Sequence, residues 1–308
     1  MKSFILLSLI LGLVFQVTST PSPVSTSLVS SQHNDRKRLT KRRWMFYSFR
    51  KAFSGKEDAV LIPPWYIVMN MIYNRNKTVG RQETIVYGVN GTVVDWGNYL
   101  KIKKYRWSEN IPKSYAFLGM TSDINQQVKA YSSIPSSYWW QRTNYRSKFK
   151  GNVCYDFVIS DINNKAADHE LMLWLEWEGN QMPIGTGRPT RRIHDLYGQN
   201  WTVYQGTNTD INVQVTSILP DKQYTNRYFE GDMKLWLNKL IELRIFKEDG
   251  YISAANMGME AFWGESLFRA NSTLQLLWAG NNYTVGYIPP HWKPPAADTV
   301  VPGYEAPT

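Results

Sequence analysis

The sequence predicts an all-β fold, a sandwich or barrel of short strands with one helix on its outside. From Lys56 to Gly286 the chain is dense in Trp, Tyr, Val and Ile, and clusters of Asn, Gly, Pro or Asp interrupt it about every 8 to 12 residues. One segment departs from this pattern and has helical periodicity. The composition, 43% hydrophobic and 14% aromatic over 308 residues, is sufficient for the core of such a domain.

The expected elements follow from these patterns. Runs rich in β-branched and aromatic residues, bounded by turn residues, predict strands. They are Trp65–Tyr73, Gln82–Val89, Val153–Ser160, Leu171–Trp177, Trp201–Gln205, Val213–Ile218, Ile252–Phe262 and Thr273–Trp278. In Tyr228–Leu243 apolar residues recur at intervals of three and four, so this segment is expected to form an amphipathic helix that packs against the outside of the sheets.

The first 55 residues are expected to lie outside the folded domain. One lysine, an apolar run from Phe4 to Phe15 and small residues after it predict a signal peptide over residues 1–19, and therefore a secreted protein. The run is shorter than the about 20 residues that span a bilayer, so no membrane partner is expected. Residues 20–55 are rich in Ser, Thr and Pro and then basic, which indicates a pro-segment or linker. Cleavage after Arg42 and retention as a solvated arm are both open.

Glycosylation sequons and cysteine usage agree with secretion of a protein that is stabilised by its core. Five sequons occur, at Asn76, Asn90, Asn200, Asn271 and Asn282. The single cysteine, Cys154, excludes an internal disulfide, so stability must come from apolar burial. We expect Cys154 itself to be a small buried hydrophobe.

The net charge of +10 is concentrated near the N-terminus, in the run RKRLTKRR at 36–43. Without residues 1–42 the net charge falls to +5, which argues little about partners, and no nucleic-acid partner is expected. Residues 288–308 are Pro-rich and are expected to be disordered. The folded domain is therefore expected over residues 56–287.

Three carboxylates lie within apolar, strand-like runs. Asp156 lies in NVCYDFVIS, Glu170 in HELMLWL and Glu260 in ANMGMEAFWG. An ionised carboxylate among aromatic side chains is costly unless it is solvated, paired or functional. The strands of Asp156 and Glu170 flank a polar run, Asp161–Asp168, so an antiparallel hairpin with both acids on one face is expected. A surface hairpin with ordinary exposed acids is an equal alternative on this evidence.

Other kinds of site have no support in the sequence. The histidines, at 33, 169, 194 and 291, lack the spacing of metal ligands, and no phosphate-binding loop or G-x-S-x-G motif occurs. No cofactor and no metal are therefore expected.

The carboxylate motifs resemble those of glycoside hydrolase family 12, the retaining endo-β-1,4-glucanases and xyloglucan hydrolases. HELMLWLEWEGNQMPIG, residues 169–185, is similar to the family's E-[IL]-M-[IL]-W-L and P-I-G motifs. GMEAFWG, residues 258–264, is similar to its G-T-E-x-F motif, and Cys154-Tyr155-Asp156-Phe157 to its S-Y-D-[LF]-F strand. A weaker similarity covers YIVMNMIY at 66–73.

The resemblance implies a β-jelly roll of two stacked, curved antiparallel sheets with one outer α-helix, whose concave face binds a glucan chain. It implies that Glu170 is the nucleophile, Glu260 the general acid/base, and Asp156 the hydrogen-bond partner of the nucleophile. The side chains that it places along the substrate are Met172, Trp174, Phe262, Pro183, Asn70, Tyr73 and Trp96. The implied partner is a β-1,4-glucan or xyloglucan, and a monomer is expected.

Three departures from the family pattern keep a second function open. Tyr73 replaces a cleft Trp, Met71 replaces an Asn, and Met259 replaces the Thr before the acid/base. A catalytically silent glucan binder or an inhibitor decoy on the same scaffold is therefore the alternative. A family 11 xylanase is disfavoured, because the E-L-M-x-W-L and P-I-G motifs are those of family 12.

Overall fold

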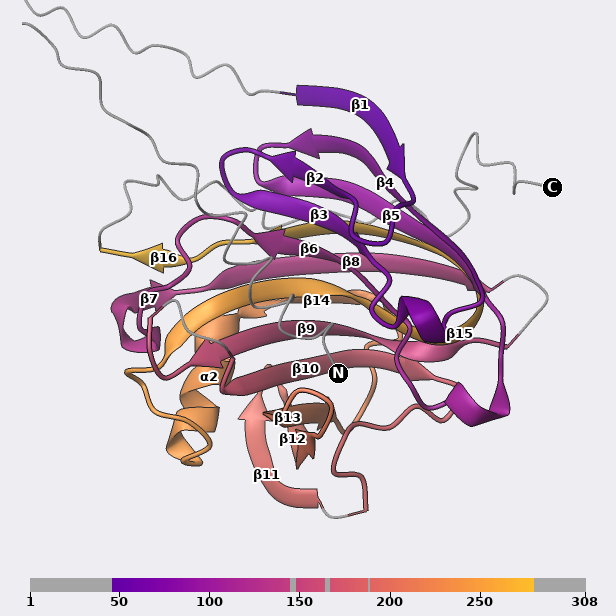
Figure 1. Ribbon diagram of the computed structural model, residues 1–308. Coiled ribbons are helices and arrows are strands. Elements are labelled where there is room, and N and C mark those ends of the chain that lie inside the picture. Colours follow the sequence, from indigo (N-terminus) through magenta and orange to yellow (C-terminus); the bar gives the residue numbers. More distant parts are fainter. Residues whose placement is uncertain (1–45, 145–147, 164–166, 188, 280–308) are drawn as a thin grey trace, which may run out of the picture.

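The protein is a sandwich of two curved β-sheets, seen in a computed structural model that describes residues 46–144, 148–163, 167–187 and 189–279 (Figure 1). In chain order the elements are β1 (Phe46–Phe53), β2 (Ala59–Ile62), β3 (Tyr66–Met71), η1 (Arg75–Lys77), β4 (Gly80–Asn90), β5 (Val93–Ile102), η2 (Arg106–Ser108), β6 (Ser114–Met120), η3 (Val128–Ala130), β7 (Tyr131–Ser133), β8 (Pro135–Asn144), β9 (Lys150–Ser160), β10 (His169–Glu178), β11 (Pro189–Leu196), β12 (Gln199–Asn208), β13 (Val213–Pro220), β14 (Tyr228–Asp232), α2 (Met233–Glu242), β15 (Tyr251–Leu274) and β16 (Leu277–Trp278).

The two sheets share one long strand. Sheet A has the order β1-β4-β5-β15-β8-β14, and sheet B has the order β2-β3-β6-β15-β9-β10-β13-β12-β11. The first part of β15 pairs with β6 and β9, and the second part pairs with β5 and β8. Among the described strands of the two sheets, all neighbours are antiparallel except β10 and β13, which are parallel. The expected strand Ile252–Phe262 therefore continues to Leu274. Of the second expected strand, Thr273–Trp278, only Thr273 and Leu274 belong to it, and Leu277–Trp278 form β16.

β15 changes sheets at a glycine. Its pairing with β9 shifts register between Ala261 and Trp263, and its pairing with β5 begins at Gly264. Gly264 has φ +123°, which other residues rarely adopt, and a Cβ there would lie 2.7 Å from the Lys148 carbonyl oxygen. A β-bulge followed by a glycine is a common way for a strand to bend, because the extra residue interrupts the ladder locally. The switch follows directly after Glu260 in the chain.

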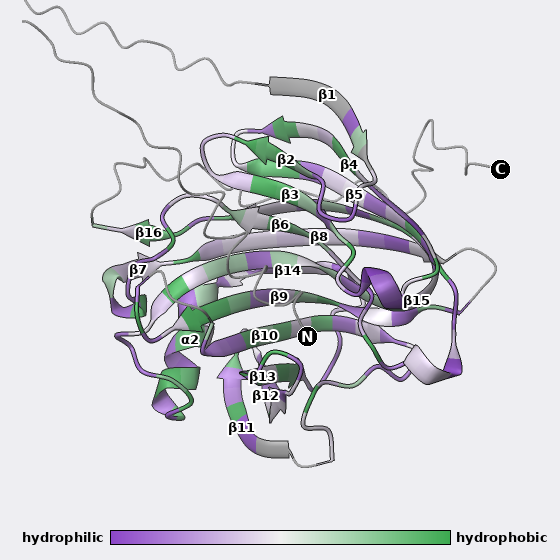
Figure 2. Cartoon of the chain, viewed as in Figure 1, coloured by the Kyte–Doolittle hydropathy of each residue, from purple (hydrophilic) through white to green (hydrophobic). Residues whose placement is uncertain are grey.

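The core lies between the sheets and takes alternate residues of each strand. Tyr155 of β9 packs edge-on against Tyr138 of β8, with ring centroids 5.8 Å apart, so this face of sheet B is turned toward sheet A. Leu171 and Leu173 of β10 belong to the same buried cluster. Apolar stretches along β9 and β10 are visible in Figure 2. We call this face the inner face of sheet B, and the opposite face its outer face.

The expected helix is present but begins five residues later than expected. Tyr228–Asp232 instead form β14, whose pairing with β8 overrides the helical pattern of the sequence. Asp232 then caps α2 by accepting a hydrogen bond from the Lys234 backbone N–H at 2.9 Å. Trp236 packs against Phe157 of β9 at 5.5 Å, which fixes the helix to the inner face of sheet B.

The N-terminal boundary of the folded domain also differs from the expectation. Residues 46–53, assigned to the linker from the sequence, form β1 and pair with β4. The signal peptide over 1–19, the rest of the segment to residue 45 and the tail over 288–308 lie outside the described residues. Within the described part of the chain, no helix is long and apolar enough to cross a membrane.

Candidate active site

The outer face of sheet B carries a second apolar cluster that surrounds the three acids. We call it the outer-face cluster, and its buried members are Met69, Met71, Tyr115, Phe117, Cys154, Met172, Trp174, Val215 and Leu219. They come from β3, β6, β9, β10 and β13, because each of these strands turns every second side chain to this face. A surface lined with apolar residues around a few polar groups is typical of a ligand site.

Strand register brings the acids onto this face. β9 and β10 are antiparallel, with Asp156 opposite Met172, so Asp156 and Glu170 are diagonal neighbours on one face. This confirms the hairpin expected from the sequence. On the other side of β9, Glu260 of β15 lies opposite Asn152. β9 therefore separates Glu170 from Glu260, and all three acids point away from the core.

Burial raises the pKa of each acid. Loss of water raises the pKa of Glu170 to about 7. Loss of water also raises the pKa of Glu260 to about 7, with the charge of Glu170 adding to the rise. The pKa of Asp156 is held well above its usual range by burial and by both glutamates. Near neutral pH the site therefore holds protons that exposed carboxyls would have lost.

Asn152 is a polar contact of Glu260 that was not expected from the sequence. Its Nδ2 donates a hydrogen bond to Glu260 Oε2 at 2.8 Å, which stabilises the ionised carboxylate and lowers its pKa against the effect of burial. The signal was available, because residues 152, 154 and 156 of β9 alternate onto the same face.

Tyr73 lies beside the acids, as the family pattern implied. It is half-buried at the margin of the outer-face cluster. Burial and the nearby charge of Glu170 raise the pKa of its phenol, and the Asn208 side chain hydrogen-bonds that phenol. Asn208 is a second neighbour that the sequence did not indicate.

Met172 and Trp174 also face the acids, but they are covered. Met172 is 7% exposed, and Trp174 is 1% exposed. The indole of Trp174 lies 6.3 Å from that of Trp177, in a tilted arrangement. Met172 therefore offers a small contact surface next to Glu170, and Trp174 is buried within the outer-face cluster.

Cys154 is fully buried between the acids and behaves as expected of a small hydrophobe. It is a free thiol within the outer-face cluster, and burial raises its pKa well above the usual value, with Glu260 as the next cause. Among the described residues, no group of three or more His, Cys, Asp or Glu side chains is arranged to hold a metal ion.

Comparison with known proteins identifies the family. Residues 66–285, more than two thirds of the chain, match the sequence profile of Glycosyl hydrolase family 12. The chain belongs to glycosyl hydrolase family 12.

Relatives of the family 12 domain include active and inactive proteins. A xyloglucan-specific endo-β-1,4-glucanase A of Emericella nidulans is 28% identical over 217 residues, which cover 70% of this chain and 86% of that protein. An inactive glycoside hydrolase of Phytophthora nicotianae is 26% identical over 205 residues, covering 65% and 81%.

The fold is that of solved family 12 enzymes. Endoglucanase 3 of Trichoderma harzianum superposes with a TM-score of 0.66 at 22% identity, covering 75% of this chain and 99% of that one. This confirms the β-jelly roll that the resemblance implied, with one α-helix among the described residues.

Two of the residues expected to contact the substrate are buried away from the acids. Trp96 is 0% exposed, donates from Nε1 to Ser272 Oγ at 3.1 Å and packs edge-on against Phe268. It lies in the core on β5 of sheet A and cannot stack on a sugar. Asn70 is also 0% exposed, because it alternates to the inner face of sheet B. There it donates from Nδ2 to the Gly55 carbonyl oxygen at 2.7 Å.

Phe262 and Pro183 are also placed differently from the expectation. Phe262 is 3% exposed and belongs to the main core cluster, because the β-bulge after Ala261 interrupts the alternation that would return it to the face of Glu260. Pro183 is buried, and its carbonyl oxygen accepts hydrogen bonds from Thr186. Both residues support the fold next to the site, and neither offers an open surface to a sugar.

Proposed function

We propose that this protein is a secreted, monomeric, retaining endo-β-1,4-glucanase that hydrolyses the backbone of xyloglucan or a cellulose-like glucan. The observation that carries the proposal is the set of three half-buried acids on the outer face of sheet B. Two carboxyls, one ionised and one protonated, are what retaining glycoside hydrolysis requires. Membership of family 12 and relatives named as xyloglucan-specific endoglucanases support the choice of substrate.

In the first step Glu170 acts as the nucleophile. A carboxylate oxygen attacks the anomeric carbon, and the bond from that carbon to the leaving glycosidic oxygen breaks. Glu260 donates its proton to that oxygen as it leaves. Burial and the charge of Glu170 favour the protonated form of Glu260, which is the form that the step requires.

In the second step Glu260 acts as a general base. The ionised Glu260 accepts a proton from water, whose oxygen attacks the anomeric carbon and displaces Glu170. Asn152 donates to Glu260 Oε2 and stabilises this ionised form between the two steps. The enzyme returns to its starting protonation state, and the sugar keeps its β-configuration.

Asp156 keeps Glu170 ionised. Its own pKa is held well above the usual range, so it is the acid expected to carry a proton at neutral pH. Asp156 Oδ1 is buried without a hydrogen-bond partner in the described part of the chain. A proton on Asp156 that is shared with its diagonal neighbour Glu170 would stabilise the carboxylate of the nucleophile.

A silent glucan binder remains the second candidate, because two observations favour it. A relative of similar identity is an inactive glycoside hydrolase. This chain also carries Tyr73 and Met259 at positions where the family pattern has Trp and Thr. The acids are intact, so the enzyme is favoured.

The test is reducing-sugar release from xyloglucan, mixed-linkage β-glucan, carboxymethylcellulose and xylan. Glu170→Gln and Glu260→Gln should each lower kcat/KM on the preferred glucan by about 10²-fold or more. Glu248→Gln, an exposed acid between α2 and β15, is the matched control and should retain activity. Folded protein that binds glucan without turning over any of the four would establish the silent binder instead.

A further inference from the structure

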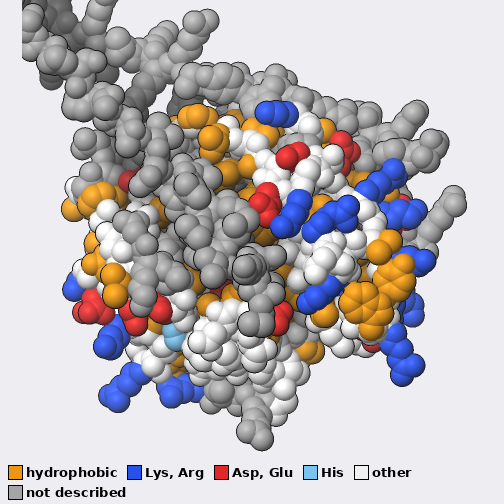
Figure 3. All heavy atoms as spheres, in the orientation of Figure 1, with side chains coloured by type: hydrophobic (Ala, Val, Ile, Leu, Met, Phe, Trp, Pro, Cys, Tyr) orange, Lys and Arg blue, Asp and Glu red, His pale blue; other side chains and the backbone are white. Residues whose placement is uncertain are grey.

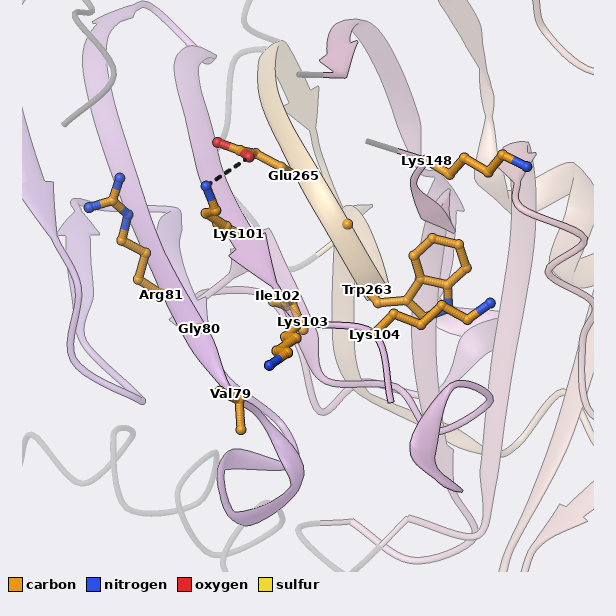
Figure 4. A pocket seen from close by; sticks show the side chains of 11 residues that line it. Val79, Gly80, Arg81, Lys101, Ile102, Lys103, Lys104, Lys148, Trp263 and Glu265 are labelled. Carbon is orange, nitrogen blue, oxygen red and sulfur yellow. Dashed lines mark ion pairs between the residues drawn. The ribbon is translucent and has the colours of Figure 1, made fainter. Parts of the chain in front are cut away.

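A second candidate site lies at the corner of the sandwich, where β15 leaves sheet B for sheet A. A groove of about 600 Å³ opens there, and residues of β4, β5 and β15 line it together with the segments that follow β5 and precede β9 (Figure 4). We call it the corner groove. Its volume is in the range of about 300–1,000 Å³ that is usual for ligand sites. It shares no residue with the outer-face cluster, although Trp263 on its wall follows Glu260 by only three positions.

The corner groove has a strong excess of positive charge. Its cations are Arg81, Lys101, Lys103, Lys104 and Lys148, and its one acid is Glu265. Glu265 pairs with Lys101 at 3.1 Å, and Glu109, just outside the groove, pairs with Lys104 at 2.9 Å. Two acids thus accompany five cations.

Further cations surround this corner. Arg106 and Lys150 also act on Glu109, whose pKa is lowered first by its hydrogen bond with Lys104. In Figure 3 Lys and Arg side chains line the right-hand end of the molecule. Cations held together repel one another, and an anion from outside the protein would relieve that repulsion.

Aromatic side chains lie among these cations. Lys104 Nζ is 4.6 Å from the ring centre of Trp263, and Lys103 Nζ is 5.2 Å from that of Tyr105. Tyr105 in turn lies 6.3 Å from Trp107, which is 66% exposed. Trp and Tyr side chains are enriched at binding surfaces, because they combine a large apolar ring with a polar group. Val79 and Ile102 complete an apolar lining between the charged groups.

We propose that the corner groove binds an anionic polysaccharide whose pyranose rings carry free carboxylates, a polyuronide. Such a chain has apolar ring faces that fit the aromatic and aliphatic lining, and carboxylates at the ring edge that fit the lysines. A membrane surface is a poorer match, because the charged residues line a concave groove and not a flat or protruding face. Bound in this way, the enzyme would be held on a uronide-containing matrix while the outer face of sheet B remains open.

The test uses polygalacturonate as the probe and its fully methyl-esterified form as the uncharged counterpart. The full secreted protein should bind the first and not the second, and binding should weaken with salt. Lys103→Gln with Lys104→Gln should weaken binding about 3- to 30-fold, as expected for the loss of two exposed ion pairs. The matched control, Lys222→Gln with Lys247→Gln, removes two exposed lysines from other loops and should stay within about 2-fold of wild type.

Trp107→Ala separates a sugar site from a general polyanion site. The variant should weaken binding of polygalacturonate, because stacking on the indole is lost, and should leave binding of polyphosphate unchanged. Equal binding of polyphosphate, RNA or phosphatidylserine vesicles by wild type, equal affinity for the esterified polymer, or equal loss in both lysine pairs would overturn the proposal.

The corner groove is independent of catalysis, so its test is separable from that of the proposed function. Glu170→Gln should bind polygalacturonate as wild type does, while losing glucan hydrolysis. The Lys103/Lys104 variant should hydrolyse soluble xyloglucan at the wild-type rate, because neither lysine touches the acids. Normal binding of polygalacturonate by the Lys103/Lys104 variant would contradict the corner-groove proposal alone. Full glucan hydrolysis by Glu170→Gln would contradict the proposed function alone.

Discussion

The two faces of sheet B are made by alternate residues of the same strands, yet they bury different chemistry. On β9 and β10 the inner face presents Tyr155, Phe157 and Leu173 to a mainly apolar core. The outer face presents Asp156 and Glu170 within an apolar cluster. Both faces exclude water, but the three acids whose pKa values burial raises lie on the outer face. Exclusion of water stabilises the fold on one side and raises carboxyl pKa values on the other.

The largest expected effect tests whether the outer face performs acid catalysis. Glu260→Gln should lower kcat/KM on a glucan by about 10²- to 10⁴-fold, because the leaving sugar oxygen needs a proton. An aryl glycoside with an acidic phenol needs little protonation, so its cleavage should fall far less. The measurement is kcat/KM on both substrates. An equal loss on both would contradict the role of Glu260 as the acid.

The next effect tests whether Trp96 belongs to the core. Trp96→Ala should lower the free energy of unfolding by about 3–5 kcal/mol, because it leaves a cavity beside Phe268. The KM of the folded variant should not change.

Tyr73→Ala should have the opposite effect, with a raised KM and a small loss of stability, since Tyr73 is half-buried beside the acids. Urea unfolding and steady-state kinetics measure both, and a raised KM in Trp96→Phe would return Trp96 to the substrate site.

A smaller effect concerns the free energy of unfolding, which the burial of Glu170 on the outer face lowers at high pH. The pKa of Glu170 is about 7 in the folded protein and 4.5 in the reference state, so the folded protein holds this proton more tightly. That contribution to stability is complete below pH 4.5 and is lost as the pH rises to 7. Glu170→Gln should therefore be more stable than wild type at pH 8, by about 1–3 kcal/mol, and little changed at pH 4. Urea unfolding at both pH values tests this, and a difference independent of pH would contradict it.

The smallest effect concerns Asn152. Its hydrogen bond to Glu260 stabilises the ionised carboxylate, so Asn152→Ala should raise the pKa of Glu260. The alkaline limb of kcat/KM against pH should then move upward by about 0.5–1 pH unit. A fall in rate with no movement of that limb would mean that Asn152 acts on structure alone.

Local patterns were enough to find the acids and their hairpin. Asp156 and Glu170 each lie in an apolar run, and a polar run joins their strands. Alternation assigns side chains to faces without knowledge of partners, because successive strand residues point in opposite directions. The same reasoning would have found Asn152, which lies two strand periods before Asp156.

Aromatic residues could not be assigned in this way. The chain has 13 Trp, and a Trp in the core has the same local pattern as one at a site. Trp96 was misplaced because its environment depends on β15, which pairs with β5 from far along the chain. Phe262 was misplaced because a β-bulge between Ala261 and Trp263 shifts the alternation.

By itself, the sequence determined the all-β class, one amphipathic helix and three acids in apolar strands, since each depends on periodicity and polarity over a few residues. Only the tertiary structure decided that β15 passes between the sheets, that Asn152 meets Glu260, and that Tyr228–Asp232 pair with β8. It also gathered Arg81, Lys101 and Lys148 into one groove from separate parts of the chain. These features depend on pairing between distant segments, whose register is set by the packing of the whole sandwich.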